Sequence, residues 1–160
     1  MAANTRHLRR AIHADAPAIA HILLSAFEPF RPLYTQGGFV ATTPGAEVIV
    51  HRFDEGPVWL AFDGNEALGT VAAVLRGDRL YVRSMAVLPS ARGLGVGSAL
   101  LREVESFAAS QEALSLYLST TPFLHDAIRL YERFGFRRTE EGPHELFGTP
   151  LFTMEKQRRH

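Results

Sequence analysis

The sequence predicts an α/β fold built on a mixed, mostly antiparallel sheet that has a central parallel strand pair and is flanked by helices. Three β-like runs, at 57–62, 66–75 and 80–87, are joined by tight turns, so they are expected to be antiparallel. The third run leads through a glycine-rich loop into an amphipathic helix and then into an alternating segment. Because such a crossover is right-handed, the two strands that it joins are expected to be parallel.

The N-terminal part of the chain predicts one strand and one helix. A short strand is expected from His7 to Ile12. Asp15 is the expected N-cap of the helix, Pro17 lies in its first turn, and the helix is expected to stop at Pro29. The apolar residues of this segment follow helical spacing: Ile19, Ile22, Leu23, Ala26 and Phe27.

The middle of the chain predicts a loop, a short helix and two turns. Residues 30–38 are rich in aromatic residues and glycine, and Thr43-Pro44 is expected to cap a short helix that runs to about Phe53. Residues 63–65, Asp-Gly-Asn, form a good hairpin turn between the first two β-like runs. Gly77-Asp78 then turns the chain into the third run.

The C-terminal half predicts two helices and two strands. The first helix follows the glycine-rich loop and has an apolar core face: Leu100, Leu101, Val104, Phe107 and Ala108. Leucines alternate along 114–120, as in a strand. A second helix covers about 124–134, with Gly135 as its expected C-terminal stop. A loop at 141–144 precedes a last strand at about 151–154.

The glycine-rich loop at 92–98 has the sequence Arg-Gly-Leu-Gly-Val-Gly-Ser and opens the first of these helices. Glycines let the backbone approach an anion without obstruction by a Cβ atom, and the first N–H groups of a helix are free to bind it. Arg92 adds a positive charge and a forked donor for phosphate oxygens. The loop therefore predicts a pyrophosphate site.

Two other phosphate-binding motifs are disfavoured by what this loop lacks. A P-loop needs Lys and then Ser or Thr after its last glycine, but Gly97 is followed by Ser98 and Ala99. A dinucleotide fingerprint needs a third glycine three residues after Gly95, and that position is Ser98. Magnesium-nucleotide and dinucleotide binding are therefore not expected.

The pattern that fits is Arg/Gln-x-x-Gly-x-Gly/Ala, matched by Arg92, Gly95 and Gly97. It resembles the motif with which the GCN5-related N-acetyltransferase (GNAT) family binds the pyrophosphate of acetyl-coenzyme A. Residues 127–136, Ala-Ile-Arg-Leu-Tyr-Glu-Arg-Phe-Gly-Phe, are similar to a later motif of that family. The resemblance covers nearly the whole chain. It implies a single acyl-CoA N-acyltransferase domain over 1–160, with its core at about 7–156.

The same resemblance implies which residues bind the cofactor. The strand at 80–87 is expected to splay from its parallel neighbour and to bind the pantetheine arm through backbone groups of Met85 and Val87. An N–H near Met85 or Ala86 is placed to donate to the thioester oxygen. The implied acetyl-CoA-binding set, with no metal ligand in it, is Met85, Ala86, Val87, Arg92, Gly93, Leu94, Gly95, Val96, Gly97 and Ser98.

Tyr131 occupies the position at which the family commonly places a general acid for the departing thiolate. A phenol has a pKa near 10, so it is protonated at neutral pH and able to donate. The alternative is a packed core aromatic. The chain departs from the family at Leu124, where many members carry Asn. Candidate substitutes for that polar contact are Ser119, Thr120 and His125.

The sequence does not identify a general base. His125 is a candidate because histidine titrates near neutrality, and a surface histidine is the alternative. Glu140, Glu141 and His144 lie in a loop that either borders the acceptor site or is simply solvated. Water can also relay the proton, so the reaction does not require an identified base.

Two further groups are candidates for the acceptor side. Arg83 is expected to share a face with Met85, where it either binds an acidic acceptor or forms a salt bridge. Phe30, Tyr34 and Phe39 match by position the variable segment that lines the acceptor pocket in the family. Their alternative role is a satellite hydrophobic cluster.

Composition limits the partners. The chain has 17 Lys and Arg against 17 Asp and Glu, so no overall field favours nucleic acid or an anionic membrane. It has no cysteine, which excludes disulfides, thiolate zinc sites and an acyl-cysteine intermediate. No segment approaches the roughly 20 apolar residues that a membrane span needs. A cytoplasmic protein is expected.

The expected function is acetyl-CoA-dependent transfer of an acetyl group directly to a primary amine of a small molecule or a protein. Two alternatives remain: a noncatalytic acyl-CoA-binding module, and a nucleotide-binding regulator, which the loop disfavours. The acceptor stays open between a protein amine, an amino-acid-like amine, a polyamine and an antibiotic-like amine. The length of the acyl group is also open, as is a homodimer formed through the C-terminal strand.

Overall fold

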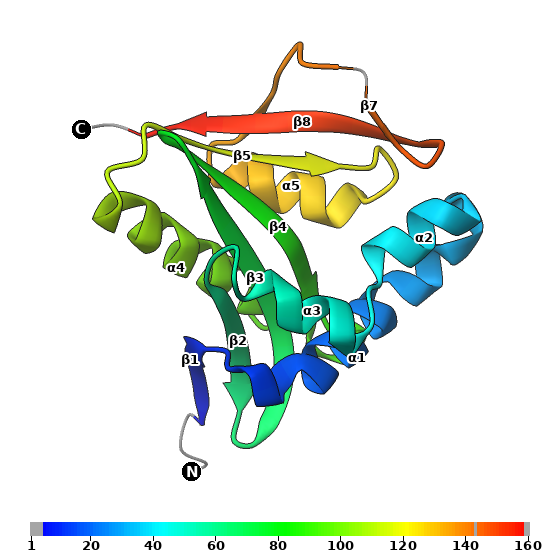
Figure 1. The fold of residues 1–160 in the computed structure, drawn as a ribbon, viewed down its shortest axis with the longest axis vertical. Coiled ribbons are helices and arrows are strands. Elements are labelled where there is room, and N and C mark those ends of the chain that lie inside the picture. Colours follow the sequence, from blue (N-terminus) through cyan, green and yellow to red (C-terminus); the bar gives the residue numbers. More distant parts are fainter. Residues whose placement is uncertain (1–4, 143, 159–160) are drawn as a thin grey trace.

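The computed structural model describes residues 5–142 and 144–158, and a strongly twisted sheet runs through its centre (Figure 1). The strand order is β1-β2-β3-β4-β5-β8-β6, and β7 pairs with β8 outside this path. The strands are β1 (Arg6–Arg10), β2 (Val58–Asp63), β3 (Glu66–Arg76), β4 (Arg79–Val87), β5 (Ser115–Thr120), β6 (Arg137–Arg138), β7 (His144–Leu146) and β8 (Thr149–Gln157).

Helices cover both faces of the sheet (Figure 1). They are α1 (Ala16–Phe27), α2 (Gln36–Thr42), α3 (Ala46–Arg52), α4 (Val96–Ser110) and α5 (His125–Arg133), with 3₁₀ turns at His13–Asp15, Glu28–Leu33 and Pro89–Ala91. Trp59 of β2 packs edge-on against Phe107 of α4, with ring centroids 5.5 Å apart. Its neighbours Val58 and Leu60 are also buried, and they point to the opposite face because side chains alternate along a strand.

The expected fold class is confirmed. β1, β2, β3 and β4 pair antiparallel in chain order, and β4 pairs parallel with β5. The turns at 63–65 and 77–78 connect β2 to β3 and β3 to β4, as the sequence predicts. Among the described residues, no helix is long and apolar enough to cross a membrane.

The parallel pair is short, and this opens the fold. β4 and β5 are in register only from Arg79 opposite Ser115 to Tyr81 opposite Tyr117. Farther along, the register of β4 against β3 shifts beside Ser84, whose φ is +54°, a left-handed conformation that is rare for a side chain of this kind. The carboxyl half of β4 therefore leaves β5, which confirms the expected splay.

Two details at the N-terminus differ from expectation. β1 covers Arg6–Arg10 rather than extending to Ile12. Asp15 precedes α1, but its side chain does not cap that helix. Its carboxylate instead accepts the Ile12 N–H at 2.8 Å and pairs with Arg9 at 2.8 Å, so it closes the 3₁₀ turn before the helix. α1 ends at Phe27, close to the predicted stop.

The segment expected to be an aromatic, glycine-rich loop contains part of α2. Gly37 and Gly38 disfavour a helix locally, but Thr35 caps it by accepting the Gly38 N–H at 3.0 Å. A Cβ atom on Gly37 would lie 2.9 Å from Cβ of Phe147, so the glycines allow α2 to pack against the β7–β8 hairpin. The next helix, α3, is capped by Gly45 rather than by Thr43-Pro44.

The remaining differences concern strand limits. β5 begins at Ser115, and Leu114 is 47% exposed, so this leucine lies outside the core that was expected to hold it. The last strand, β8, is longer than 151–154 and pairs with β5 on one side. Of the expected loop at 141–144, Pro143 lies outside the described residues.

Candidate active site

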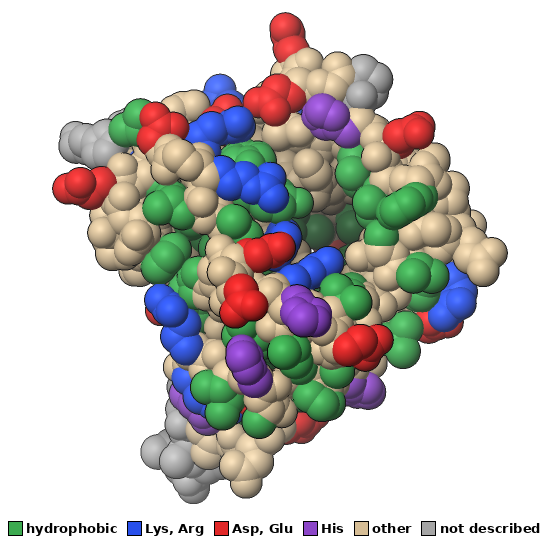
Figure 2. Space-filling view, in the orientation of Figure 1, with side chains coloured by type: hydrophobic (Ala, Val, Ile, Leu, Met, Phe, Trp, Pro, Cys, Tyr) green, Lys and Arg blue, Asp and Glu red, His purple; other side chains and the backbone are tan. Residues whose placement is uncertain are grey.

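A cavity of about 730 Å³ opens where β4 leaves β5. α1, α2 and α3 contribute to one side of it, and the glycine-rich loop, the start of α4 and α5 contribute to the other. Figure 2 shows it as a hollow in the face of the molecule, with Lys or Arg side chains (blue) beside it. The splay of the sheet is therefore what creates the site.

The glycine-rich loop forms one end of the cavity. Gly93 and Gly95 both have φ of +80°, a conformation that other residues rarely adopt, and an added Cβ atom on either would meet nothing within 4 Å. The first helical hydrogen bond of α4 joins the Ala99 N–H to the carbonyl of Gly95 at 3.0 Å. The N–H groups just before Ala99 therefore have no acceptor within the helix, and the space beside the loop is open to an anion.

Gly97 contributes to the site in a different way. It lies inside α4, and a Cβ atom there would stand 2.8 Å from Cδ2 of Leu130 and 3.3 Å from Cε of Met85. The missing side chain lets α4 pack closely against α5 and β4. Gly97 thus joins the three elements that surround this end of the cavity, whereas Gly93 and Gly95 supply backbone conformation.

The structure brings nearly all the predicted cofactor residues to one cavity. Those that line it are Met85, Ala86, Val87, Arg92, Gly93, Gly95, Val96, Gly97 and Ser98. Leu94 is the exception, because it is 49% exposed and is not part of the cavity wall. Its carbonyl oxygen accepts a hydrogen bond from the side chain of Arg6.

Arg92 connects the loop to the other side of the cavity. Its Nη2 donates to the carbonyl of Ala26 at 3.5 Å, and its guanidinium lies 5.9 Å from the ring centroid of Phe30. Both contacts hold the positive charge at the mouth of the site, next to the glycine-rich loop. An anion bound at the loop would therefore lie close to a cation that is already positioned.

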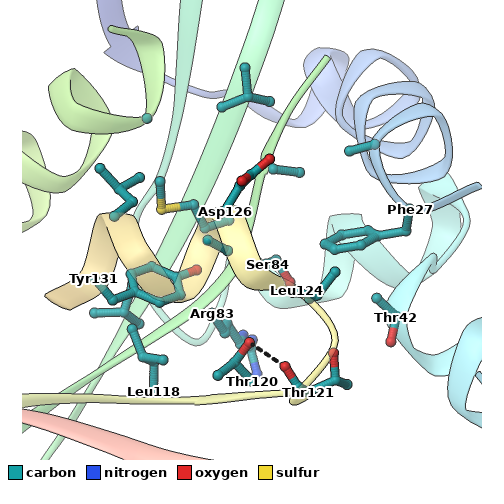
Figure 3. Close-up of a pocket in the computed structure, with 18 of the residues that line it drawn as sticks. Phe27, Thr42, Arg83, Ser84, Leu118, Thr120, Thr121, Leu124, Asp126 and Tyr131 are labelled. Carbon is teal, nitrogen blue, oxygen red and sulfur yellow. Dashed lines mark hydrogen bonds between the residues drawn. The ribbon is translucent and has the colours of Figure 1, made fainter. Parts of the chain in front are cut away.

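Tyr131 enters the cavity from α5. Figure 3 shows its hydroxyl pointing into the open space, while its ring packs edge-on against Phe136 at 6.0 Å. Burial raises the pKa of Tyr131 to about 12, with a smaller contribution from Tyr34. The phenol is therefore protonated at neutral pH and available as a hydrogen-bond donor.

The wall near Leu124 contains hydroxyl groups. Ser119, Thr120, Thr121 and Leu124 all line the cavity, whereas His125 is exposed and does not. The Thr121 hydroxyl is buried in this wall beside Tyr34; burial raises the pKa of Tyr34, and the Thr121 hydroxyl partly offsets that rise. Sequence reasoning missed Thr121, because a single threonine after a strand carries no distinctive signal.

The three polar residues of the expected acidic loop do not form part of the cavity wall. Glu140, Glu141 and His144 are exposed and none of them is part of the cavity wall. Glu141 pairs with Arg79 at 3.3 Å. Leu146 and Leu151 of the adjoining β7–β8 hairpin do line the cavity, so the segment lies beside it without placing these three side chains in its wall.

Arg83 forms the salt bridge that was one of the two roles considered for it. It lines the cavity, and it also forms an ion pair with Glu55. Its Nε is buried without a hydrogen-bond partner. Burial lowers the pKa of Arg83, and the positive charge of Arg52 lowers it further.

Arg52 and Ser84 are cavity residues that the sequence did not single out. Arg52 is the last residue of α3, and its Nη1 donates to the Ser84 hydroxyl at 2.9 Å. Ser84 stands at the β4 irregularity described above. The alternation of apolar and polar residues along a strand does not reveal a bulge. The contact between Arg52 and Ser84 therefore could not be predicted from the sequence.

The aromatic segment is divided between both of its proposed roles. Phe30 and Tyr34 line the cavity. Phe39 is buried outside the wall, where it packs edge-on against Tyr34 at 5.8 Å. Phe123 also contacts Tyr34, at 4.8 Å between ring centroids. The cluster therefore supports the cavity wall as well as contributing to it.

Comparisons with known proteins agree with this geometry. The model of the Acetyltransferase (GNAT) family matches residues 18–136. The uncharacterized N-acetyltransferase YjgM of Escherichia coli is 27% identical over 139 residues, which cover 83% of each chain. Rat N-acetyltransferase 8F1 is 33% identical over 90 residues, or 52% of this chain. The chain spans about two fifths of the length of the rat and mouse relatives that it matches, 41% and 40%.

Solved structures share the fold over nearly the full chain. The PaiA N-acetyltransferase of Thermoplasma acidophilum, in complex with coenzyme A, gives a TM-score of 0.81 at 15% identity and covers 96% of this chain and 99% of its own. A GCN5-related N-acetyltransferase of Rhodopseudomonas palustris gives 0.78 at 19% identity, with 99% of both chains covered. At these identities the likeness concerns the fold alone.

Proposed function

The chain belongs to the acetyltransferase (GNAT) family, and on that premise we propose that it transfers an acetyl group from acetyl-CoA directly to a primary amine. One observation carries the proposal: the glycine-rich loop and the Tyr131 hydroxyl open into the same cavity, which forms where β4 leaves β5. Transfer from acetyl-CoA needs a binding loop for the pyrophosphate at one end of this molecule. It also needs a proton donor near the thioester at the other end.

The proposed position of acetyl-CoA follows from the unused backbone groups. The N–H groups at the start of α4, together with Arg92, take the pyrophosphate. Beyond Tyr81, no described residue of β4 pairs with β5, so that edge of β4 is free to hydrogen-bond an extended pantetheine arm. The relative from Thermoplasma acidophilum that was solved with coenzyme A has the same fold, which supports this arrangement.

The proposed reaction is a single acyl transfer. The amine nitrogen attacks the thioester carbonyl carbon, a C–N bond forms, and the C–S bond breaks. The proton that the amine loses ends on sulfur, so the products are an N-acetyl amide and coenzyme A. The chain has no cysteine, which is consistent with direct transfer rather than an acyl-cysteine intermediate. A backbone N–H near Met85 or Ala86 is proposed to stabilise the oxyanion.

Tyr131 is the proposed donor to the departing thiolate. Since a thiol has an ordinary pKa near 8.5, a phenol with a pKa of about 12 does not give up its proton to a thiolate outright. Its hydrogen bond can stabilise the developing negative charge. A proton can pass through the phenol only as the proton from the amine replaces it.

A second candidate function is a noncatalytic acyl-CoA-binding module of the same fold. It is favoured by one observation: among the described residues that line the cavity, Asp126 is the one carboxylate, and it is paired with Arg129. No unpaired base is therefore in place. Under this alternative, acetyl-CoA binds but no amine releases coenzyme A from it.

The experiment that tests the proposal is a calorimetric titration with acetyl-CoA, alongside ATP and NAD. Gly95→Glu should abolish acetyl-CoA binding, because the side chain adds bulk and negative charge to the open space beside the loop. Gly64→Glu is the matched control: Gly64 has φ of +59° and open surroundings, but it lies in the β2–β3 turn. Thiol release with a panel of amines then separates transferase from binding module.

The outcomes are distinct. The glycine-rich loop is supported as the acetyl-CoA site if the wild-type chain binds acetyl-CoA saturably, Gly95→Glu removes this binding and Gly64→Glu leaves it intact. No acetyl-CoA binding by the wild-type chain contradicts both the transferase and the binding module. Tighter binding of ATP or NAD than of acetyl-CoA would instead favour a nucleotide-binding regulator.

A further inference from the structure

The end of the cavity opposite the glycine-rich loop has an excess of positive charge. We propose that the acceptor is a primary amine that also carries a carboxylate, as an amino acid does, and that Arg52 binds this carboxylate with Arg83 beside it. This inference rests on the proposed acetyl transfer and specifies its second substrate.

Arg83 and Val87 mark two ends of the same strand segment. Because of the bulge at Ser84, the four steps from Arg83 to Val87 lie opposite only three steps of β3, so they span about 10 Å. The 3₁₀ turn Pro89–Ala91 and then the glycine-rich loop follow Val87. Ser84, which Arg52 contacts, lies at the Arg83 end. If acetyl-CoA enters with its pyrophosphate at the loop, the arginines stand beyond the acetyl group, where the acceptor has to approach.

Arg52 is a cation whose charge is not balanced. Its hydrogen bond to Ser84 uses one of its five N–H donors. No described carboxylate lies within 4.0 Å of its guanidinium. Burial lowers the pKa of Arg52, which shows that its surroundings disfavour the charge. Arg52 lines the cavity, and none of its nitrogens is buried without a partner, so its remaining donors are not enclosed by the protein.

Arg83 leaves the net charge of this end of the cavity unchanged, because it is paired with Glu55. Its ion pair with Glu55 neutralises one of the two cations, and Glu55 is not part of the cavity wall. The Arg52, Arg83 and Glu55 group therefore retains one net positive charge facing the cavity. A forked guanidinium matches the two oxygens of a carboxylate and binds them strongly.

The rest of the wall shows the same bias. The charged residues that line the cavity are Arg52, Arg83, Arg92, Asp126, Arg129 and Arg133. The single carboxylate, Asp126, is already paired with Arg129 on α5. A polyamine or a lysine in a basic peptide would bring further positive charge to this wall without finding a free carboxylate. An amine that carries its own carboxylate complements it.

The test compares acceptors that differ in this one group. Thiol release from acetyl-CoA is measured with the twenty common L-amino acids, with L-leucinamide and L-phenylalaninamide as partners of leucine and phenylalanine, and with spermidine. We expect at least one carboxylate-bearing amine to be acetylated. Its kcat/KM should exceed that of its amide by roughly 10- to 100-fold, the range for a hydrogen bond to a charged group.

Variants then assign the effect to Arg52. Arg52→Gln should raise KM for the preferred amino acid by roughly 10-fold or more, leave its amide unchanged and leave the Kd of acetyl-CoA unchanged. Arg52→Lys should recover part of the loss, since it restores the charge without the fork. Arg102→Gln is the matched control, because Arg102 is exposed on α4 and is not part of the cavity wall.

Failure of this inference can be told apart from failure of the transferase. If the protein binds acetyl-CoA and acetylates spermidine or amides as well as or better than amino acids, the inference is wrong and the transferase stands. The inference is also wrong if no carboxylate-bearing amine is acetylated by a protein that binds acetyl-CoA. If acetyl-CoA does not bind, both proposals fail together.

Discussion

The two ends of the cavity are built from different parts of the chain and by different means. The end at the glycine-rich loop comes from one nearly continuous stretch, 85–98, and its contacts depend on backbone conformation and on the absence of side chains. The end at Arg52 assembles side chains from α3, β4 and the segment after β5. The first end repeats a family pattern, whereas the second depends on the particular residues of this chain.

This difference explains what each end can specify. A backbone cradle accepts any ligand with the matching phosphate geometry, so it suits a substrate shared by a whole family. Side chains brought together from separate elements can change one at a time without disturbing the cradle. We therefore expect substitutions at the loop to affect cofactor binding or folding, and substitutions at the arginine end to affect the acceptor alone.

Tyr131→Phe should have the largest effect, and it tests whether the two ends meet in one reaction. Removing the hydroxyl should lower kcat by about 100-fold, the lower part of the range for acid–base catalysis, and leave the Kd of acetyl-CoA unchanged. Steady-state thiol release and calorimetry measure the two quantities. Tyr117→Phe is the control, since Tyr117 stacks on Tyr81 but does not line the cavity. Unchanged kcat would favour a role for Tyr131 in packing alone.

Gly97→Val should have the next largest effect and tests the packing of the loop end. The Cβ atom of the valine would lie 2.8 Å from Cδ2 of Leu130 and 3.3 Å from Cε of Met85, so both methyl groups would have to move, and the two branches of valine add to the crowding. Overpacking of this kind costs about 2 kcal/mol of unfolding free energy. Denaturant unfolding measures it, and Ala109→Val on the exposed face of α4 controls for the helical cost of valine. If both variants lose the same unfolding free energy, close packing at Gly97 does not contribute to stability.

The fold was largely predictable because its order follows from local signals. Tight turns at 63–65 and 77–78 make β2, β3 and β4 antiparallel, and the crossover through α4 makes β5 parallel to β4. α2 was missed for a physical reason: its glycines oppose a helix locally, and the hairpin at Phe147 that stabilises it lies far along the chain. Local propensity cannot report such a contact.

The same contrast applies to the site. The loop residues and Tyr131 were found because their positions are fixed by spacing along the chain. Arg52 and Ser84 are 32 residues apart, and their contact depends on a left-handed residue within a strand. Leu94 shows the opposite case, since it belongs to the motif and yet lies outside the cavity wall. Spacing along the sequence therefore predicts the glycine-rich loop end of the cavity better than the Arg52 end, where side chains from separate elements meet.

Alkaline pH should have a smaller effect that sharpens the description of Tyr131. Its pKa is raised to about 12 in the folded chain, against about 10 for an unperturbed phenol. The contribution of this raised pKa to the unfolding free energy is complete below pH 10 and is lost as the pH rises through 12. The reason is that Tyr131 releases its proton at a lower pH in the unfolded chain than in the folded chain. At pH 11 the loss is about 1.4 kcal/mol of unfolding free energy relative to pH 8. Between pH 8 and pH 11, the unfolding free energy of Tyr131→Phe should fall by that much less than the unfolding free energy of the wild type. An equal fall in both proteins would contradict the raised pKa of Tyr131.

Glu55→Gln should have the smallest effect on folding and the most specific effect on the acceptor end. The Glu55 side chain is about half exposed, so its ion pair with Arg83 contributes less than about 1 kcal/mol to stability. Removing its charge leaves Arg83 as a second unbalanced cation beside Arg52, which should lower KM for a carboxylate-bearing amine by a few fold and leave its amide unchanged. Glu103→Gln, on the exposed face of α4, is the charge-matched control. Equal changes for acid and amide would show that the charge of Arg83 does not reach the acceptor, and would leave Arg52 as the sole carboxylate ligand.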